Sequence, residues 1–198
     1  MDRSDVKELY FITLISNVRS IIEYGILSHN KSVKIPHDDS IAMPKMQEKR
    51  KIKKIPGTNK KLHDYANLYF DAHNPMLCKR QNFNDKICVL RIDTSVLDIP
   101  NVIITDRNAA SDWARPYSMS DGLAAIDKDK LFAKYWTHQD NQYEQWAHKS
   151  VKCAEVLVPD KVETKYILGA FVANQAALVA FKKLGIGLTV SIKNDIFF

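Results

Sequence analysis

The chain has 198 residues, of which 45% are hydrophobic and 26% are charged, and its formal net charge is +6 at pH 7. This length and composition suit one globular domain with a substantial core and argue against disorder of the whole chain. The positive charge favours a polyanionic partner, although a modest excess of lysine is also common in proteins that bind no nucleic acid.

Three cysteines, Cys78, Cys88 and Cys153, are odd in number and form no C-x-x-C pair. They therefore predict neither a disulfide framework nor a zinc site, and a reducing cytoplasm suits them best. The charged N-terminus lacks the apolar segment of a signal peptide. No stretch reaches the roughly 20 apolar residues that a membrane span needs. We expect a cytoplasmic protein without a bound metal or a membrane anchor.

The first predicted elements are a strand over 9–14, which is aromatic and β-branched, and a helix that carries Val18, Ile21 and Ile22 on one face. Gly25 is a natural helix end. A polar region with few core residues follows, and it contains eight basic residues against one acid, Glu48. The eight are Lys45, Lys49, Arg50, Lys51, Lys53, Lys54, Lys60 and Lys61.

Short strands are predicted over 68–70, 86–92 and 102–105. Residues 106–153 are expected to form mostly loops and short helices. An insert of this size is usually functional or disordered, and its aromatic residues favour order. They are Trp113, Tyr117, Tyr135, Trp136, Tyr143 and Trp146.

The C-terminal part is regular, with strands predicted over 155–158, 166–172 and 188–192 and a helix over 174–184 that ends before Gly185. The sequence contains no phosphate-binding glycine loop and no H-E-x-x-H motif. Strands at both ends with long inserts between them favour an α+β domain over a doubly wound sheet.

Several stretches, taken in order along the chain, resemble the DarT-type ADP-ribosyltransferases, which are toxins that use NAD to modify bases in DNA. Each stretch is weak alone, but their joint order covers nearly the whole chain. They are the segments 10–13, 25–30, 46–50, 62–65, 68–70, 74–77, 105–107, 135–136, 154–158 and 192–195.

This resemblance implies an ADP-ribosyltransferase-like α+β fold with a split mixed sheet, long inserts and an NAD cleft between two sheets. Residues 1–198 would form one transferase domain. Within it, residues 45–61 would be a basic segment for NAD and nucleic acid, and residues 131–154 would recognise the acceptor. The family also implies a macrodomain-type antitoxin as a partner.

Two residues are the expected catalytic pair. Glu155 stands where the family has its catalytic glutamate, at the start of a strand, and a carboxylate there would stabilise the positive charge that builds on ribose when nicotinamide leaves. On local sequence alone, it could instead be a surface acid at a strand end. Arg50 matches the arginine of the family's Q-x-x-R segment, which positions NAD phosphate or assists proton loss from the base. Its alternative is one more cation in a solvated run.

The residues that the resemblance assigns to NAD are Tyr10, Phe11, Thr13, Leu27, Asn30, Gln47 and Tyr69. Asn30 could instead be a left-handed residue after Leu27, and Tyr69 could be plain core. Phe11 departs from the family, which usually has histidine there, so one polar contact to NAD is absent.

The nucleic acid is expected to contact the cations Lys49, Lys51, Lys53 and Lys54 and the rings of Trp136, Trp146 and His148. Any one of these rings could instead pin the long insert to the core. A second departure from the family, at 71–74, could alter how the acceptor is held. His63 and Asp64 are expected to be structural, within the turn before Tyr65.

The predicted function is transfer of ADP-ribose from NAD to a base in single-stranded DNA, by a toxin of a toxin–antitoxin or phage-defence system. The same chemistry on RNA is an alternative, since stacking and phosphate contacts hardly distinguish the two acceptors. A second alternative is a nucleic-acid-binding module that has lost its activity, with Phe11 as the trace of that loss. Modification of proteins ranks below both.

Overall fold

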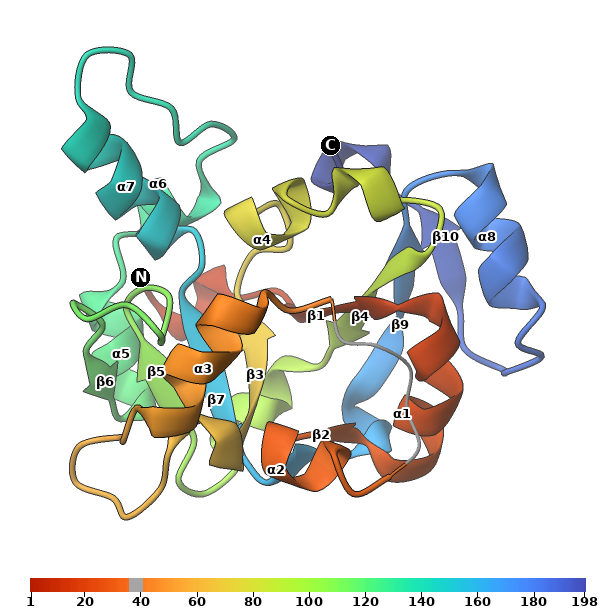
Figure 1. The fold of residues 1–198 in the computed structure, drawn as a ribbon, viewed down its shortest axis with the longest axis horizontal. Coiled ribbons are helices and arrows are strands. Elements are labelled where there is room, and N and C mark those ends of the chain that lie inside the picture. Colours follow the sequence, from red (N-terminus) through yellow and green to blue (C-terminus); the bar gives the residue numbers. More distant parts are fainter. Residues whose placement is uncertain (36–40) are drawn as a thin grey trace.

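The computed structural model describes residues 1–35 and 41–198 and is built on an eight-stranded mixed sheet with the order β10-β9-β4-β1-β3-β7-β5-β6 (Figure 1). A separate pair is formed by β2 and β8. The strands are β1 (Leu9–Leu14), β2 (Ile26–Leu27), β3 (Tyr65–Tyr69), β4 (Ile87–Ile92), β5 (Ile103–Thr105), β6 (Pro116–Tyr117), β7 (Glu155–Pro159), β8 (Lys161–Val162), β9 (Ile167–Val172) and β10 (Val190–Ile192).

Eight α-helices in the described residues surround this sheet. In Figure 1, α3 lies in front of β3 and β7, and α8 lies at the other side of the molecule beside β10. The helices are α1 (Val18–Tyr24), α2 (His29–Ser32), α3 (Pro44–Ile52), α4 (Pro75–Cys78), α5 (Met119–Ala125), α6 (Lys128–Phe132), α7 (Gln142–Val151) and α8 (Gln175–Lys182). None of these helices is long and apolar enough to cross a membrane.

The large sheet is nearly divided between β1 and β3. A single registered pair, Tyr10 with Tyr69, joins these two strands, whereas β1 pairs with β4 along its whole length and β3 pairs with β7 along its whole length. Strands β9 and β10 are parallel, and the other neighbours are antiparallel. The expected split mixed sheet is therefore present as two halves that touch at one point and diverge beyond it.

Several predicted elements are confirmed because their local signals agree with their packing. Strand β1 and helix α1 lie where periodicity placed them, and Gly25 ends the helix with φ of 88°. A Cβ at Gly25 would stand 2.5 Å from the carbonyl oxygen of Val162 in β8, so only glycine fits there. Asn174 caps α8 by accepting from the backbone N–H of Ala177 at 3.0 Å.

The basic region contains more regular structure and more core residues than the sequence predicted. It contains helix α3, with Pro44 in its first turn, and the segment that follows buries Ile55 and Leu62 against Tyr65 and Leu157. Most side chains of α3 are charged, so no apolar stripe announced the helix. Strand β3 also begins at Tyr65, three residues earlier than predicted.

Candidate active site

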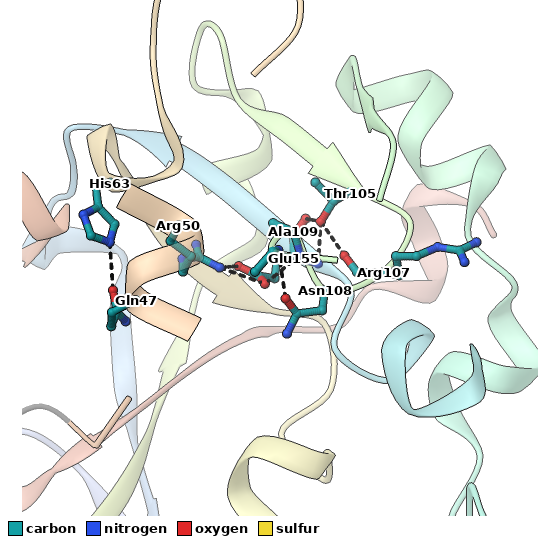
Figure 2. Close-up of polar contacts among 9 residues, drawn as sticks. Gln47, Arg50, His63, Thr105, Arg107, Asn108, Ala109 and Glu155 are labelled. Carbon is teal, nitrogen blue, oxygen red and sulfur yellow. Dashed lines mark hydrogen bonds and ion pairs between the residues drawn. The ribbon is translucent and has the colours of Figure 1, made fainter. Parts of the chain in front are cut away.

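Glu155 is fully buried at the start of β7, between Tyr69 of β3 and Thr105 of β5. Its Oε2 accepts from Arg50 Nη1 at 2.9 Å, and its Oε1 accepts from Arg50 Nη1 at 3.1 Å and from the backbone N–H of Ala109 at 3.0 Å (Figure 2). The interpretation of Glu155 as a surface acid at a strand end is therefore wrong. Three donor contacts and one full positive charge hold this carboxylate out of water.

The buried carboxylate affects the groups around it. Burial first, and the Glu155 charge second, raise the pKa of Tyr69 well above its usual value. The same two causes raise the pKa of Cys153 to about 12. Both neighbours therefore stay neutral near pH 7, and neither competes with Arg50 as the partner of Glu155.

Arg50 is the only buried residue of α3 and is 8% exposed, so it is not a solvated cation. One of its terminal nitrogens, Nη1, binds Glu155. The other, Nη2, is buried without a hydrogen-bond partner in the part of the chain that the structure describes. An unsatisfied buried donor is costly, and a ligand oxygen would remove that cost.

A cavity of about 660 Å³ opens between the two halves of the sheet. It is bounded by β1 and β3 and by residues from α1, α2, β2, α3 and α7. The predicted NAD residues Phe11, Thr13, Leu27, Gln47 and Tyr69 all line it, together with Arg50. Glu155 does not line it, so Arg50 stands between the cavity and the carboxylate.

Tyr10 and Asn30 are not among the residues that line this cavity. Tyr10 packs against the cluster that contains Ile12 and Tyr69, and burial raises its pKa to about 12. Asn30 lies in α2, where its Nδ2 donates to Asp64 Oδ1 at 2.7 Å. The alternative that Asn30 is left-handed is wrong, because its backbone is helical.

The cavity is also lined by His63, which the sequence predicted to be structural. His63 is 5% exposed and lines the cavity, and its Nε2 lies 2.9 Å from Gln47 Oε1. Its ring is 4.0 Å from the ring of His29, centroid to centroid. Burial, followed by the neighbouring His29 and Arg50, lowers the pKa of His63 to about 4. The available signal was its position two residues before β3, the strand that forms one wall.

The loop that follows β5 supplies the Ala109 N–H to Glu155. Asp106 braces this loop, because its Oδ2 accepts from the Arg107 side chain at 2.9 and 3.1 Å and its Oδ1 accepts from the Arg115 N–H at 3.0 Å. Thr105 Oγ1 adds a bond to the Arg107 carbonyl at 2.7 Å. The segment 105–107 therefore supports the loop that binds the Glu155 carboxylate.

The predicted nucleic-acid cations differ in their surroundings. Lys51 and Lys54 are exposed, and Lys49 lines the cavity with its Nζ 3.7 Å from Asp112 Oδ2. Lys53 is half-buried, donates to the Ser111 carbonyl, and has its pKa lowered by burial. Lys53 therefore ties α3 to the loop after β5 and is a poor phosphate contact.

The predicted aromatic contacts separate into two groups. Trp146 is 53% exposed on α7, lines the cavity, and packs edge-on against Tyr143. Trp136 is buried beside His73 and Phe198. Trp136 therefore pins the insert to the core, which was the alternative to a nucleic-acid contact. Its ring has no free stacking face in this structure, so that expectation is wrong.

His148 is likewise buried, and both ring nitrogens are occupied. Its Nδ1 lies 2.9 Å from His138 Nε2, and its Nε2 lies 2.9 Å from the Lys130 carbonyl. These contacts connect α7 to α6 and to the loop between them. His148 presents no free face for a base, which corrects the sequence prediction.

A family model described as "ssDNA thymidine ADP-ribosyltransferase, DarT" matches residues 10–198. The chain belongs to the DarT family. Among curated DarT relatives, a DNA ADP-ribosyl transferase–DNA ADP-ribosyl glycohydrolase fusion protein of Thermosipho africanus is 33% identical over 188 residues, which is 89% of this chain and 45% of the fusion. A DNA ADP-ribosyl transferase of a Thermus species is 31% identical over 65% of this chain and 66% of its own.

Solved DarT structures share the fold. The Thermus sp. 2.9 DarT in complex with ADP-ribosylated single-stranded DNA superimposes with a TM-score of 0.82 at 26% identity, covering 98% of this chain and 97% of that one. The Thermosipho africanus DarTG in complex with ADP-ribose gives 0.80 at 28% identity, over 96% of this chain and 51% of that one. The chain therefore spans about half the length of the fusion protein, and the predicted ADP-ribosyltransferase-like fold is confirmed.

Proposed function

We propose that the chain is an NAD-dependent ADP-ribosyltransferase that modifies a thymidine base in single-stranded DNA, and that residues 1–198 act as one transferase unit. The observation that carries this proposal is the buried Glu155 carboxylate, held by Arg50 and Ala109 beside a cavity between two halves of a sheet. Family membership gives the reaction and the acceptor.

The reaction breaks the bond between ribose and nicotinamide and forms a bond between the same ribose carbon and the base, while the base loses a proton to solvent. Glu155 would orient the ribose hydroxyls and stabilise the positive charge on the sugar more strongly in the transition state than before it. A guanidinium is too weak an acid to serve as an ordinary base, so Arg50 would act on the base by stabilising developing negative charge.

Arg50 covers Glu155 in the structure, so the two must part in some measure before the carboxylate touches ribose. A phosphate or a deprotonating base near Arg50 would supply a competing anion for the guanidinium. We propose that substrate binding in this way frees one carboxylate oxygen. Before substrate binds, Arg50 would keep the Glu155 carboxylate paired, and Arg50 would then be the first of the two side chains to contact substrate.

NAD would lie in the 660 Å³ cavity against Phe11, Thr13, Leu27, Gln47 and Tyr69. Phe11 and Tyr69 come from the two strands that diverge there, so their rings offer apolar faces to the nicotinamide and ribose. Tyr10 and Asn30 would act through their neighbours, since they do not line the cavity.

The single-stranded acceptor would approach across α7 and α3. Trp146 and Lys149 line the cavity from α7, and Lys49 lines it from α3. A base would stack on Trp146, and the phosphates would follow the exposed Lys51 and Lys54. We thus retain residues 131–154 as the acceptor segment, with α7 as its contact surface, and residues 45–61 as the basic segment.

The fusion of the Thermosipho africanus relative to a DNA ADP-ribosyl glycohydrolase supports a toxin whose product a macrodomain-type antitoxin removes. We propose the same pairing for this chain, with the antitoxin on the same or a separate polypeptide. An acceptor in DNA is the reason to place the reaction in the cytoplasm.

The test is incubation with NAD and either single-stranded DNA or RNA of the same base order, followed by mass spectrometry and measurement of nicotinamide release. We expect a mass gain of one ADP-ribose on DNA. Glu155→Gln keeps the side-chain shape and should lower the rate by at least about 10²–10³-fold. Glu163→Gln is the matched control, because Glu163 is exposed and pairs only with Lys165 among the described residues.

Four results would contradict this proposal. A mass gain on RNA alone would favour the RNA acceptor, and a gain on the protein would favour protein modification. Salt-sensitive binding of DNA without nicotinamide release would favour the inactive binding module. Equal rates for wild type and Glu155→Gln would remove Glu155 from the reaction.

A further inference from the structure

Gln47 and Arg50 are three residues apart on α3, a spacing that places them on one face of the helix. In Figure 2, Gln47 extends to His63 and Arg50 extends to Glu155. Both line the NAD cavity. Gln47 contacts His63 and Arg50 contacts Glu155, so each of these helix residues has a buried partner outside α3. The two contacts together determine which polar atoms of α3 remain for a ligand.

The contact between Gln47 and His63 decides the orientation of an amide. A neutral imidazole has one N–H, and burial together with the neighbouring positive groups keeps His63 neutral. Gln47 turns its Oε1 toward His63 Nε2 at 2.9 Å, which requires the proton on Nε2. The amide oxygen of Gln47 then accepts from His63, and the amide NH₂ group of Gln47 is left to donate to a ligand.

Arg50 adds a second donor at the same place. Its Nη1 is committed to Glu155, while Nη2 is buried and has no partner within the described residues. Gln47 and Arg50 thus leave two donors for a ligand, while the amide oxygen of Gln47 faces His63. A group with several acceptor oxygens and no proton to offer matches that arrangement, and a phosphate is such a group.

We propose that His63 is a positioning residue, which fixes the Gln47 amide so that its NH₂ and Arg50 Nη2 together bind a phosphate oxygen of NAD. The inference rests on the proposed function in that its ligand is NAD. If His63 did not hold the amide, Gln47 could turn its oxygen toward the phosphate and repel it. His63 would therefore affect NAD binding without touching NAD's reacting atoms.

Two substitutions of His63 separate this role from mere packing. The amide nitrogen of a glutamine side chain reaches the place of Nε2, whereas that of asparagine reaches only the place of Nδ1. His63→Gln keeps the donor to Gln47 and His63→Asn removes it, with both residues polar and neutral. We expect the Kd for NAD to stay within about threefold in His63→Gln and to rise about tenfold in His63→Asn.

The measurements are NAD binding by calorimetry and the kinetics of nicotinamide release. The expected pattern in His63→Asn is a raised KM with kcat within about twofold, because the lost contact serves bound substrate and transition state alike. Gln47→Glu, which places oxygen where the NH₂ stood, should raise KM more than His63→Asn. The ¹⁵N chemical shifts of His63 in the wild type should report a proton on Nε2.

Equal Kd values for the two His63 variants, or a proton on Nδ1 in the wild type, would overturn this inference while leaving the proposed reaction intact. A loss of kcat with unchanged KM would also overturn it, since that pattern belongs to a catalytic group. Failure of the wild type to bind NAD at all would contradict the proposed function itself. Circular dichroism of each variant confirms that it folds.

Discussion

Phe11 stands where the resemblance to the DarT family leads us to expect histidine, and its side chain lines the cavity that we propose for NAD. It is partly buried in β1 and packs against the main core as well as facing the cavity. A ring in that position offers contact area in place of a hydrogen bond. Phenylalanine in place of histidine therefore offers NAD an apolar contact where a hydrogen bond was expected, and it leaves no gap in the cavity wall.

We predict that Phe11→Ala raises the KM for NAD by about tenfold, since an aromatic contact is worth roughly 1 kcal/mol beyond its buried area. Phe11→Leu retains most of the volume and is the control for packing. The assay is nicotinamide release across a range of NAD concentrations. An unchanged KM in Phe11→Ala would show that the ring serves the core alone.

The pKa of His63 has a consequence for stability. Its folded pKa of about 4 lies below its usual value of 6.5, so between these values the unfolded chain binds more protons than the folded one. The contribution of neutral His63 to the free energy of unfolding is fully present above pH 6.5, and it declines as the pH falls toward 4. Burial also lowers the pKa of His148, which acts in the same direction.

We predict that His63→Gln loses less stability than the wild type when the pH is lowered from 7 to 5, because glutamine has no proton to bind. His148 is present in both proteins, so their difference isolates His63. Urea unfolding at the two pH values is the measurement. Parallel losses in the two proteins would mean that His63 titrates in the folded state as it does in the unfolded chain.

The corner between α7 and β7 positions the insert 106–153 against the strand that begins with Glu155. Lys152 at this corner is fully buried, and its Nζ donates to Asp71 after β3 and to the Ala133 carbonyl at 2.9 Å. It also lies 5.9 Å from the ring centre of Trp136. Lys152, three residues before Glu155 in the chain, thus joins the insert to the segment that follows β3.

We predict that Lys152→Met lowers the free energy of unfolding by about 3–5 kcal/mol, since it leaves Asp71 without its counter-charge. The double variant Lys152→Met/Asp71→Asn should recover part of this loss, because neither charge is then left alone. Lys165→Met, at an exposed ion pair with Glu163, should change stability little. Thermal and urea unfolding give the comparison, and a double variant as unstable as the single one would show that the charges are not coupled.

Two groups of basic residues lie far apart on the molecule. The basic segment 45–61 lies around α3 beside the cavity, while Lys182 and Lys183 end α8 at the other side of the molecule (Figure 1). The net charge of +6 alone does not say which of these attracts nucleic acid. Proximity to the cavity favours α3.

We predict that Lys51→Glu/Lys54→Glu weakens binding of single-stranded DNA and reduces the steepness of its salt dependence by about 0.7 per lost phosphate contact. Lys182→Glu/Lys183→Glu makes the same change in net charge on exposed residues of α8 and should leave the slope nearly unchanged. The measurement is the binding constant at several salt concentrations. Equal effects of the two pairs would mean that net charge alone drives binding.

Much of the fold was predictable because its signals are local. Strand β1, helix α1 with Gly25, strand β7 and helix α8 each have their own periodicity and end signals, and all four lie where the sequence placed them. Helix α3 was not predicted because most of its side chains are polar and its few apolar residues form no stripe. A helix without an apolar stripe is indistinguishable from a solvated loop until its partners are known.

What the sequence determined by itself was the family, the positions of the main strands along the chain and the candidacy of Glu155 and Arg50, since motifs and alternation are properties of neighbouring residues. Only the tertiary structure decided that Arg50, among eight cations, is the one that meets Glu155, which is 105 residues away. It likewise decided that Trp146 is open while Trp136 and His148 are buried, and that His63 holds Gln47. Burial and pairing arise from contacts between distant segments, and no local pattern encodes which segments meet.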